Sequence, residues 1–206
     1  MTELHIGMVG YGEVGKTFAS GLRPHLPAVC AWDLQFAAGA SRDTALAHAA
    51  QAGVAVCDSL QALCADADLL ISAVTASSTL AVAQEAARHI RKGTVFLDLN
   101  SASPGTKQAA AKLIDGAGAH YVEAGVMTSV PPYGIRVPML LGGARAAELA
   151  GLLNTWGMDA RAVSERLGVA SAIKMPGSPK AMPGPYFFRS QGVRSVEKNE
   201  PKLIEK

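Results

Sequence analysis

Short runs of apolar residues alternate with amphipathic stretches along most of the chain. The apolar runs are continuous rather than alternating with polar residues, which is typical of strands covered on both faces of a parallel sheet. They predict strands over residues 4–9, 28–32, 54–57, 69–74, 94–97, 120–122, 137–141 and 159–163. The stretches between them predict helices over residues 13–22, 43–51, 59–64, 78–90, 106–113, 144–153 and 170–175. This succession predicts an α/β fold with a doubly wound, mostly parallel sheet and right-handed crossovers.

A glycine-rich turn joins the first predicted strand to the first predicted helix, and it reads Gly10-Tyr11-Gly12-Glu13-Val14-Gly15. The first glycine permits the turn, the second lets the backbone approach a pyrophosphate, and the third lets the helix pack closely on the strand. The helix N-terminus then faces the phosphate charge. The order of strand, turn and helix therefore favours a Rossmann-type dinucleotide site. The alternative is a glycine-rich turn that binds nothing.

An acidic residue, Asp33, ends the second predicted strand, 18 residues after Gly15. A carboxylate about 20 residues beyond the glycine turn can hydrogen-bond the hydroxyls of the adenosine ribose, and it repels a 2′-phosphate. We therefore predict NAD as the cofactor. NADP stays an alternative because Arg42 is close in sequence, and Asp33 could also be an ordinary residue at the end of a strand.

Small and polar residues follow two further predicted strands, where ligands of open parallel sheets bind. Ala73, Val74 and Thr75 would let the nicotinamide half of a cofactor lie against the backbone, although Thr75 and the serines after it could instead cap the next helix. Asn100 and Ser101 offer short donors and acceptors at the same edge. Ser103, before Pro104, reads as a helix N-cap.

The composition indicates one well-buried domain, because 49% of the 206 residues are hydrophobic and only 17% are charged. We place this domain at residues 1–175. Residues 176–206 carry a net charge of +3 and many prolines, and we interpret them as an irregular basic tail, or as an extension that packs on a partner through Tyr186-Phe187-Phe188. The nearly neutral remainder gives no electrostatic reason to expect nucleic acid as a partner.

The cysteines and histidines show no metal-ligand spacing, so no metal site is expected. An odd number of cysteines within apolar runs indicates reduced thiols and a cytoplasmic location. The N-terminus does not read as a signal peptide. No uncharged run approaches the ~18 residues that a membrane span requires, so no membrane association is expected. The three cysteines are Cys30, Cys57 and Cys64.

The glycine turn and three later segments together resemble the β-hydroxyacid dehydrogenases, which include 6-phosphogluconate dehydrogenase and 3-hydroxyisobutyrate dehydrogenase. The later segments are residues 98–104, 123–143 and 168–174. The resemblance implies an NAD(P)-dependent oxidoreductase that acts on a small hydroxy acid and could form a homodimer. It implies that Asn100 and Ser101 approach the nicotinamide and the substrate. It also implies that Lys174 is the catalytic acid/base at the start of a helix that joins two domains.

The sequence departs from this family at three points. Met127-Thr128-Ser129 stands where the family has a Ser-Gly-Gly substrate element, so 6-phosphogluconate is not the expected substrate. Ser178, beyond Pro176-Gly177, stands where the family commonly has an asparagine. The family also continues into a helical domain of roughly a hundred residues, a usual domain size. We therefore expect that domain to be truncated or absent, through a frameshift or in a natural variant, and the chain to be inactive alone.

Two other functions fit part of the pattern. A stand-alone Rossmann module that senses NAD(H) needs the glycine turn and Asp33, but neither Lys174 nor Asn100. A methyltransferase is a weaker third interpretation, because its turn usually reads GxGxG and Val14 occupies the place of the last glycine.

Overall fold

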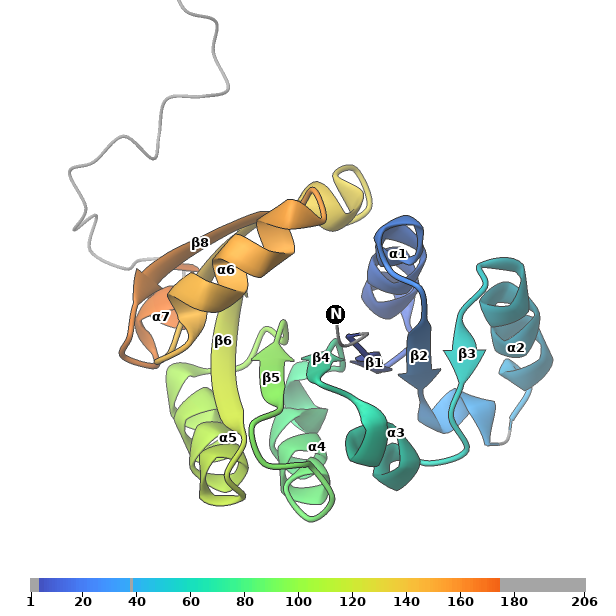
Figure 1. Cartoon of the computed structure of the whole chain (residues 1–206), viewed down its shortest axis with the longest axis horizontal. Helices are drawn as coiled ribbons and strands as arrows, with labels where there is room; N and C mark the ends of the chain where they lie inside the picture. The colour runs from blue at the N-terminus through green and yellow to red at the C-terminus, as the bar shows by residue number, and fades with distance from the viewer. Residues whose placement is uncertain (1–3, 38, 175–206) are drawn as a thin grey trace, which may run out of the picture. The chain divides into compact units, whose positions relative to one another are not determined.

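The structure is a computed structural model that describes residues 4–37 and 39–174. Within these ranges, eight strands form one sheet in the order β3-β2-β1-β4-β5-β6-β7-β8 (Figure 1). Neighbouring strands pair in parallel, except that β6 and β7 are antiparallel. The strands are β1 (Ile6–Val9), β2 (Val29–Trp32), β3 (Ala55–Val56), β4 (Leu69–Ser72), β5 (Val95–Asp98), β6 (His120–Val126), β7 (Pro138–Gly142) and β8 (Asp159–Ser164).

Helices cover both faces of the sheet, so the described part of the chain has three layers (Figure 1). One apolar core joins the sheet to α1 (Glu13–Leu22), α2 (Arg42–Gln51) and α6 (Ala146–Thr155). A second core, on the other face, joins it to α3 (Leu60–Asp66), α4 (Thr79–Ala86) and α5 (Pro104–Gly116). The short helix α7 (Val169–Lys174) packs on β6. Single 3₁₀ turns are η1 (Arg23–His25), η2 (Leu34–Phe36), η3 (Ala76–Ser78) and η4 (Gly134–Arg136).

The predicted α/β fold is confirmed, and each predicted strand and helix has a counterpart. The helix predicted over 13–22 has those bounds in α1. Ser103 is the N-cap of α5, with its hydroxyl accepting from the N–H of Thr106 at 3.2 Å, and Pro104 is the first helical residue. The boundary predicted at residues 175 and 176, and the tail beyond it, lie outside the described residues.

One difference from the sequence prediction lies in β6, which continues to Val126 rather than ending at Val122. From Ala124 onward, β6 no longer pairs with β5 but still pairs with β7. The segment between β6 and β7 spans residues 127–137 and holds only the single turn η4. Such a connection is too short for a crossover helix, so β7 returns antiparallel.

The helices in the described ranges are all too short or too polar to cross a membrane. Likewise, these ranges contain no group of three His, Cys, Asp or Glu side chains able to hold a metal ion. Cys30, Cys57 and Cys64 are free thiols. The cytoplasmic location expected from them stays a prediction.

Candidate cofactor-binding site

The glycine turn lies where the strand order of the sheet reverses, because β1 pairs with β2 on one side and with β4 on the other. Gly10 has a φ of +94°, and a Cβ there would lie 2.5 Å from the carbonyl oxygen of Ala73. A Cβ at Gly15 would lie 2.0 Å from the carbonyl oxygen of Gly10. Both glycines are therefore required by the protein's own packing, which brings α1 close to the turn and the turn close to the end of β4.

Gly12 differs from its two neighbours, because no atom lies within 4 Å of where its Cβ would stand. It is exposed and is the N-cap of α1, where no side chain bonds the first N–H groups of the helix. Those N–H groups have no partner within the helix. Next to them, Glu13 is exposed and Val14 is half-buried. Open space above a helix N-terminus is what an approaching pyrophosphate requires.

Asp33 binds the turn directly. Its Oδ2 accepts from the N–H of Tyr11 at 2.5 Å, and its Oδ1 accepts from the N–H of Gln35 at 2.8 Å. The amide of Gln35 in turn donates to the carbonyl of Tyr11 at 3.0 Å. The carboxylate predicted to hold the adenosine ribose thus lies beside the turn, and its position is fixed by two backbone hydrogen bonds.

The side chain of Tyr11 anchors the turn from below. It is fully buried, its ring centroid lies 5.2 Å from that of Phe36, and its hydroxyl hydrogen-bonds Nδ1 of His48 at 3.1 Å. Burial raises the pKa of the Tyr11 hydroxyl. Arg42, the residue that leaves NADP open, donates from Nε to the carbonyl of Phe36 at 3.0 Å. Its side chain therefore braces the end of η2.

Asn100 links the carboxyl ends of β4 and β5. Its Oδ1 accepts from the N–H of Val74 at 2.7 Å, and its Nδ2 donates to Oγ of Ser72 at 3.1 Å. Asn100 is only 4% exposed, so its side chain shapes the edge from beneath. Ser101, next along the chain, is exposed at this edge. The structure thus brings Asn100 together with the segment from Ala73 to Thr75.

The hydroxyls after β4 interact with one another rather than with backbone N–H groups. Oγ1 of Thr75 lies 3.1 Å from Oγ of Ser77 and 2.9 Å from Oγ of Ser78. Ser78 is the N-cap residue of α4, but its side chain makes no capping hydrogen bond. The capping interpretation of these residues was therefore wrong, and Thr75 remains exposed at the edge.

A buried polar cluster beneath this edge was missed from the sequence. Asp98 accepts from the hydroxyl of Tyr121 and, at 2.7 Å, from the N–H of Asn100. Nζ of Lys107 donates to the carbonyls of Asp98 at 3.0 Å and Ala124 at 2.8 Å, which ties β5 to β6. In the sequence, only Lys107 indicates this cluster, because it lies on the same face of α5 as the buried Ala110, Ala111 and Ile114.

Burial dominates the ionisation of this cluster. It raises the pKa of Asp98 although Lys107 and Tyr121 act in the opposite direction. Burial, followed by the neighbouring carboxylate, raises the pKa of Tyr121 far above its ordinary value. Tyr121 therefore keeps its proton and serves as the donor to Asp98.

A second residue missed from the sequence is Glu123, which lies beside Asp98 in the parallel register of β5 and β6. Its Oε1 accepts from the N–H groups of Gly168 at 2.8 Å and Ala170 at 3.0 Å, and its Oε2 accepts from the hydroxyl of Ser171 at 2.5 Å. Glu123 thus holds the beginning of α7, and Lys174 is the last residue of that helix that the structure describes.

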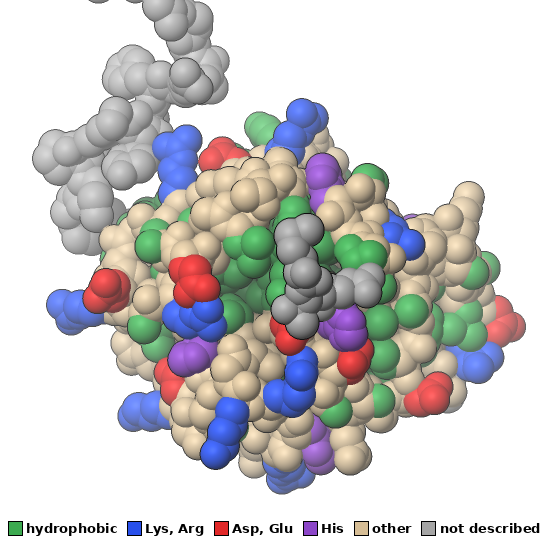
Figure 2. All heavy atoms as spheres, viewed as in Figure 1, with side chains coloured by type: hydrophobic (Ala, Val, Ile, Leu, Met, Phe, Trp, Pro, Cys, Tyr) green, Lys and Arg blue, Asp and Glu red, His purple; other side chains and the backbone are tan. Residues whose placement is uncertain are grey.

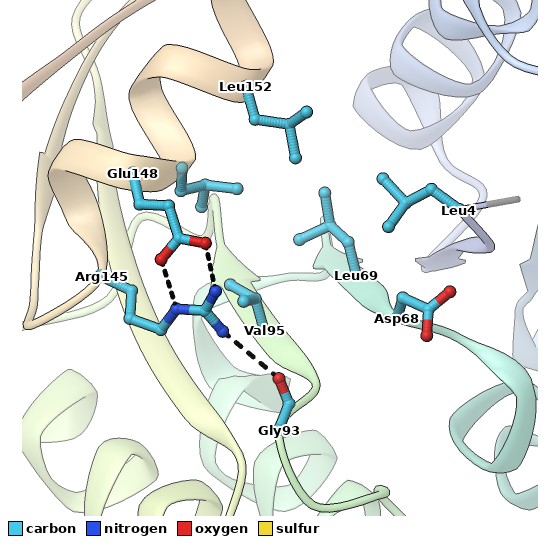
Figure 3. Close-up of a pocket in the computed structure, with 9 residues that line it drawn as sticks. Leu4, Asp68, Leu69, Gly93, Val95, Arg145, Glu148 and Leu152 are labelled. Atoms are coloured by element: carbon cyan, nitrogen blue, oxygen red, sulfur yellow. Dashed lines mark hydrogen bonds and ion pairs between the residues drawn. The ribbon is translucent and has the colours of Figure 1, made fainter. Parts of the chain in front are cut away.

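A cavity of about 440 Å³ lies at the opposite edge of the sheet, near the first residues of β4 and β5 (Figure 3). Arg145 points across its rim, with Nε donating to Glu148 at 2.7 Å and Nη1 to the carbonyl of Gly93 at 3.4 Å. On the side of the molecule that Figure 2 draws, hydrophobic side chains lie near the middle and charged side chains lie around them. The cavity is remote from the glycine turn and takes no part in the cofactor site.

Comparison with solved structures gives close relatives of unassigned function. The chain is 40% identical to a conserved hypothetical protein from Sinorhizobium meliloti, with a TM-score of 0.79, over 84% of this chain and 58% of that one. It is 31% identical to a conserved protein of unknown function described as similar to 3-hydroxyacid dehydrogenases, with a TM-score of 0.72, over 83% of this chain and 62% of that one. The 3-hydroxyisobutyrate dehydrogenase of Mycobacterium tuberculosis shares the fold at 21% identity, with a TM-score of 0.72, over 84% of this chain and 58% of that one.

Among curated proteins, an uncharacterised 28.5 kDa protein of Methanothermus fervidus is 26% identical over 84% of this chain and 63% of its own length. The chain thus spans about three fifths of the length of the relatives it matches. Residues 5–148, which contain the glycine turn, Asp33 and Asn100, match the model of the NAD binding domain of 6-phosphogluconate dehydrogenase. With this match over most of its length, the chain belongs to the family of that NAD-binding domain.

Proposed function

We propose that the protein is the cofactor-binding part of an NAD-dependent oxidoreductase that moves a hydride between the nicotinamide and the secondary alcohol of a small hydroxy acid. The observation that carries the proposal is the contrast within the glycine turn. At Gly10 and Gly15, backbone atoms occupy the space where a Cβ would stand. At Gly12, at the N-terminus of α1, that space is open. A turn that served packing alone would not need a glycine at position 12.

The cofactor would be held by two groups. The N–H groups at the start of α1 would bind the pyrophosphate, and the carboxylate of Asp33 would accept from the ribose hydroxyls. We favour NAD over NADP because Asp33 carries a negative charge where a 2′-phosphate would lie. The bonding of Arg42 to the carbonyl of Phe36 supports this choice, since that side chain is already committed to η2.

When bound, the nicotinamide would supply the hydride chemistry. The chain's residues would orient the cofactor and the substrate and exclude competing reactions. The half-buried Ala73 and Val74 offer a smooth surface at the carboxyl edge of β4. Asn100 would keep this surface in place through its bonds to β4, and Ser101 would contact the substrate from its exposed position at this edge. Lys174 would take or return the proton of the substrate hydroxyl, as the family resemblance implies.

The substrate and the assembly follow from the family more than from this chain. Met127 cannot donate the hydrogen bond that the family serine gives, so we favour a hydroxy acid other than 6-phosphogluconate. Met127 and the two residues after it are exposed where β6 ends, which supports their contact with a ligand. A homodimer is also proposed, and light scattering of the purified chain would test it.

The decisive experiment is a titration with NADH and NADPH, followed by a screen of hydroxy acids on the same sample. We expect NADH to bind more tightly than NADPH. The chain alone should turn over slowly or not at all. The variant Lys174→Ala should keep NADH binding within about twofold and remove any turnover that wild type shows, because its role would lie in the transition state only. If Lys174→Ala leaves an NADH-dependent function unchanged, the sensor alternative is correct instead. If neither nucleotide binds, the proposal fails.

A further inference from the structure

We propose that Glu123 is the positioning residue that fixes α7 on β6 and thereby sets where Lys174 meets the reacting atoms; this rests on the proposed function of Lys174. Glu123 lies in the middle of β6 and is completely buried. A buried carboxylate is costly unless its oxygens are satisfied. All three hydrogen bonds described for Glu123 come from one short segment, residues 168–171.

The direction of these bonds explains why a negative residue stands here. The two backbone N–H groups belong to Gly168 and Ala170, at the start of α7, where the helix dipole is positive. The described part of α7, residues 169–174, is too short to be stable on its own. The position of α7 is therefore determined by what its first turn binds, and Glu123 binds that turn with both carboxylate oxygens.

Three glycines fit the helix tightly against the strands. A Cβ at Gly125 would lie 2.7 Å from the carbonyl oxygen of Ala170, and a Cβ at Gly142 would lie 2.7 Å from Oε1 of Glu123. Gly168 has a φ of +90°, which allows the chain to turn into the helix. Glu123, Gly125, Gly142, Gly168 and Ser171 form what we call the α7 anchor. It holds the first turn of α7 close to β6.

The anchor reaches close to the proposed acid/base. Ser171, whose hydroxyl donates to Glu123, stands three residues before Lys174, which is less than one helical turn. Fixing Ser171 against β6 therefore also fixes the backbone of Lys174. A small displacement of a positioned catalytic group lowers the rate strongly. We expect cofactor binding at the glycine turn to be unaffected, because α7 packs mainly on β6, β7 and β8.

The test compares Glu123→Ala, Glu123→Gln and Ser171→Ala with wild type, and uses Glu148→Ala as a control on the exposed face of α6. Hydrogen exchange of the α7 amides, NADH affinity, and turnover of NAD with 3-hydroxyisobutyrate are measured for each. Glu123→Ala should speed exchange in α7 about tenfold or more. It should lower kcat by about tenfold while the NADH affinity and the KM for NAD stay within about twofold. Glu123→Gln keeps an acceptor for the backbone N–H groups and should restore most of the protection and the rate.

Two results would overturn the proposal. One is unchanged exchange in α7 when Glu123 is replaced. The other is that the Glu123 variant loses both NADH binding and hydrogen-exchange protection across the whole sheet. That result would show that Glu123 contributes to general stability. If Glu123→Ala does not fold, Ser171→Ala must loosen α7 alone, and the proposal fails if it does not. Because the chain is expected to be inactive alone, the kcat comparison applies only if wild type turns over. Without turnover, the exchange of α7 decides whether Glu123 positions it, and NADH binding tests the proposed function.

Discussion

The carbonyl oxygen of Gly10 lies 2.0 Å from where a Cβ at Gly15 would stand, which is closer than any real contact allows. Within one turn, the first and last glycines are therefore locked against each other, and only Gly12 between them is free to change. This separation makes the structural and the ligand-binding roles of the turn accessible to single substitutions.

We expect Gly12→Ala to fold normally and to lose cofactor binding. Its unfolding free energy should stay within about 0.5 kcal/mol of wild type, because the new methyl group meets no protein atom. NADH affinity, measured by fluorescence titration, should fall at least about tenfold, or ~1.4 kcal/mol.

The matched controls are two other glycines that lie within helices. Gly15→Ala should lower the unfolding free energy by about 4 kcal/mol or prevent folding, because it forces backbone apart. Gly151→Ala, exposed within α6, should raise it by about 1 kcal/mol without affecting NADH binding. Unchanged NADH affinity in Gly12→Ala would contradict a pyrophosphate at this turn.

Asp33→Asn should shift the cofactor preference toward NADPH. The substitution removes the negative charge that repels a 2′-phosphate. It also places an amide donor against the N–H of either Tyr11 or Gln35, and we expect it to cost about 1–3 kcal/mol of unfolding free energy. Parallel titrations with NADH and NADPH measure the ratio of the two affinities, with the exposed Asp43→Asn as the control. A ratio equal to wild type would mean that Asp33 does not face the ribose.

Asp98 should make stability depend on pH in the direction opposite to that of a surface carboxylate. Because burial raises its pKa in the folded state above the ordinary 3.8, the folded protein binds more protons than the unfolded chain between these two values. Stability from this group therefore rises as the pH falls through that window. Asp98→Asn should abolish the effect, since an amide can still accept from Asn100 and donate to the Tyr121 oxygen.

Urea unfolding of wild type and Asp98→Asn across the acidic range measures this difference. Relative to the variant, wild type should gain stability as the pH is lowered toward 3.8. A relative loss of wild-type stability over the same range would show that Asp98 is held as a charged group instead.

Cys57 and Cys64 should be nearly inert toward iodoacetamide in the folded protein. Burial raises the pKa of each thiol to about 12, from an ordinary value of 9.0. Because only the thiolate reacts, the rate at pH 8 should be about a thousandfold below that of the same thiols in the unfolded chain. Mass spectrometry of the alkylated peptides with and without urea provides the comparison. Rapid labelling of either residue in the native state would contradict the raised pKa of its thiol.

The sequence was sufficient to predict where the glycine turn and Asp33 lie in this fold. Glycines at 10, 12 and 15 and an acid at 33 are close in sequence to the elements that position them, so spacing alone identifies them. Their placement at the strand-order reversal followed from the alternation of apolar runs and helical stretches. The sequence did not predict that β7 runs antiparallel, because apolar runs carry no sign of strand direction.

The buried polar groups escaped prediction for a different reason. Glu123 binds residues 45 to 48 positions away, and Lys107 bridges two strands through backbone carbonyls. These partners come together only in the folded sheet, so no local pattern indicates them. Asn100 was singled out correctly as a residue of this edge, but its bonds to Val74 and Ser72 could not be foreseen.

The α7 anchor lies in the buried part of β6, and the residues that follow the strand are exposed. Gly125 has no space for a larger side chain and Glu123 is completely buried, while Met127, Thr128 and Ser129 just beyond the strand are exposed. Under the proposed function, a randomised library confined to these last three positions would test whether they contact the substrate. Substitutions intended to alter ligand contacts should therefore begin at Met127, the residue after Val126.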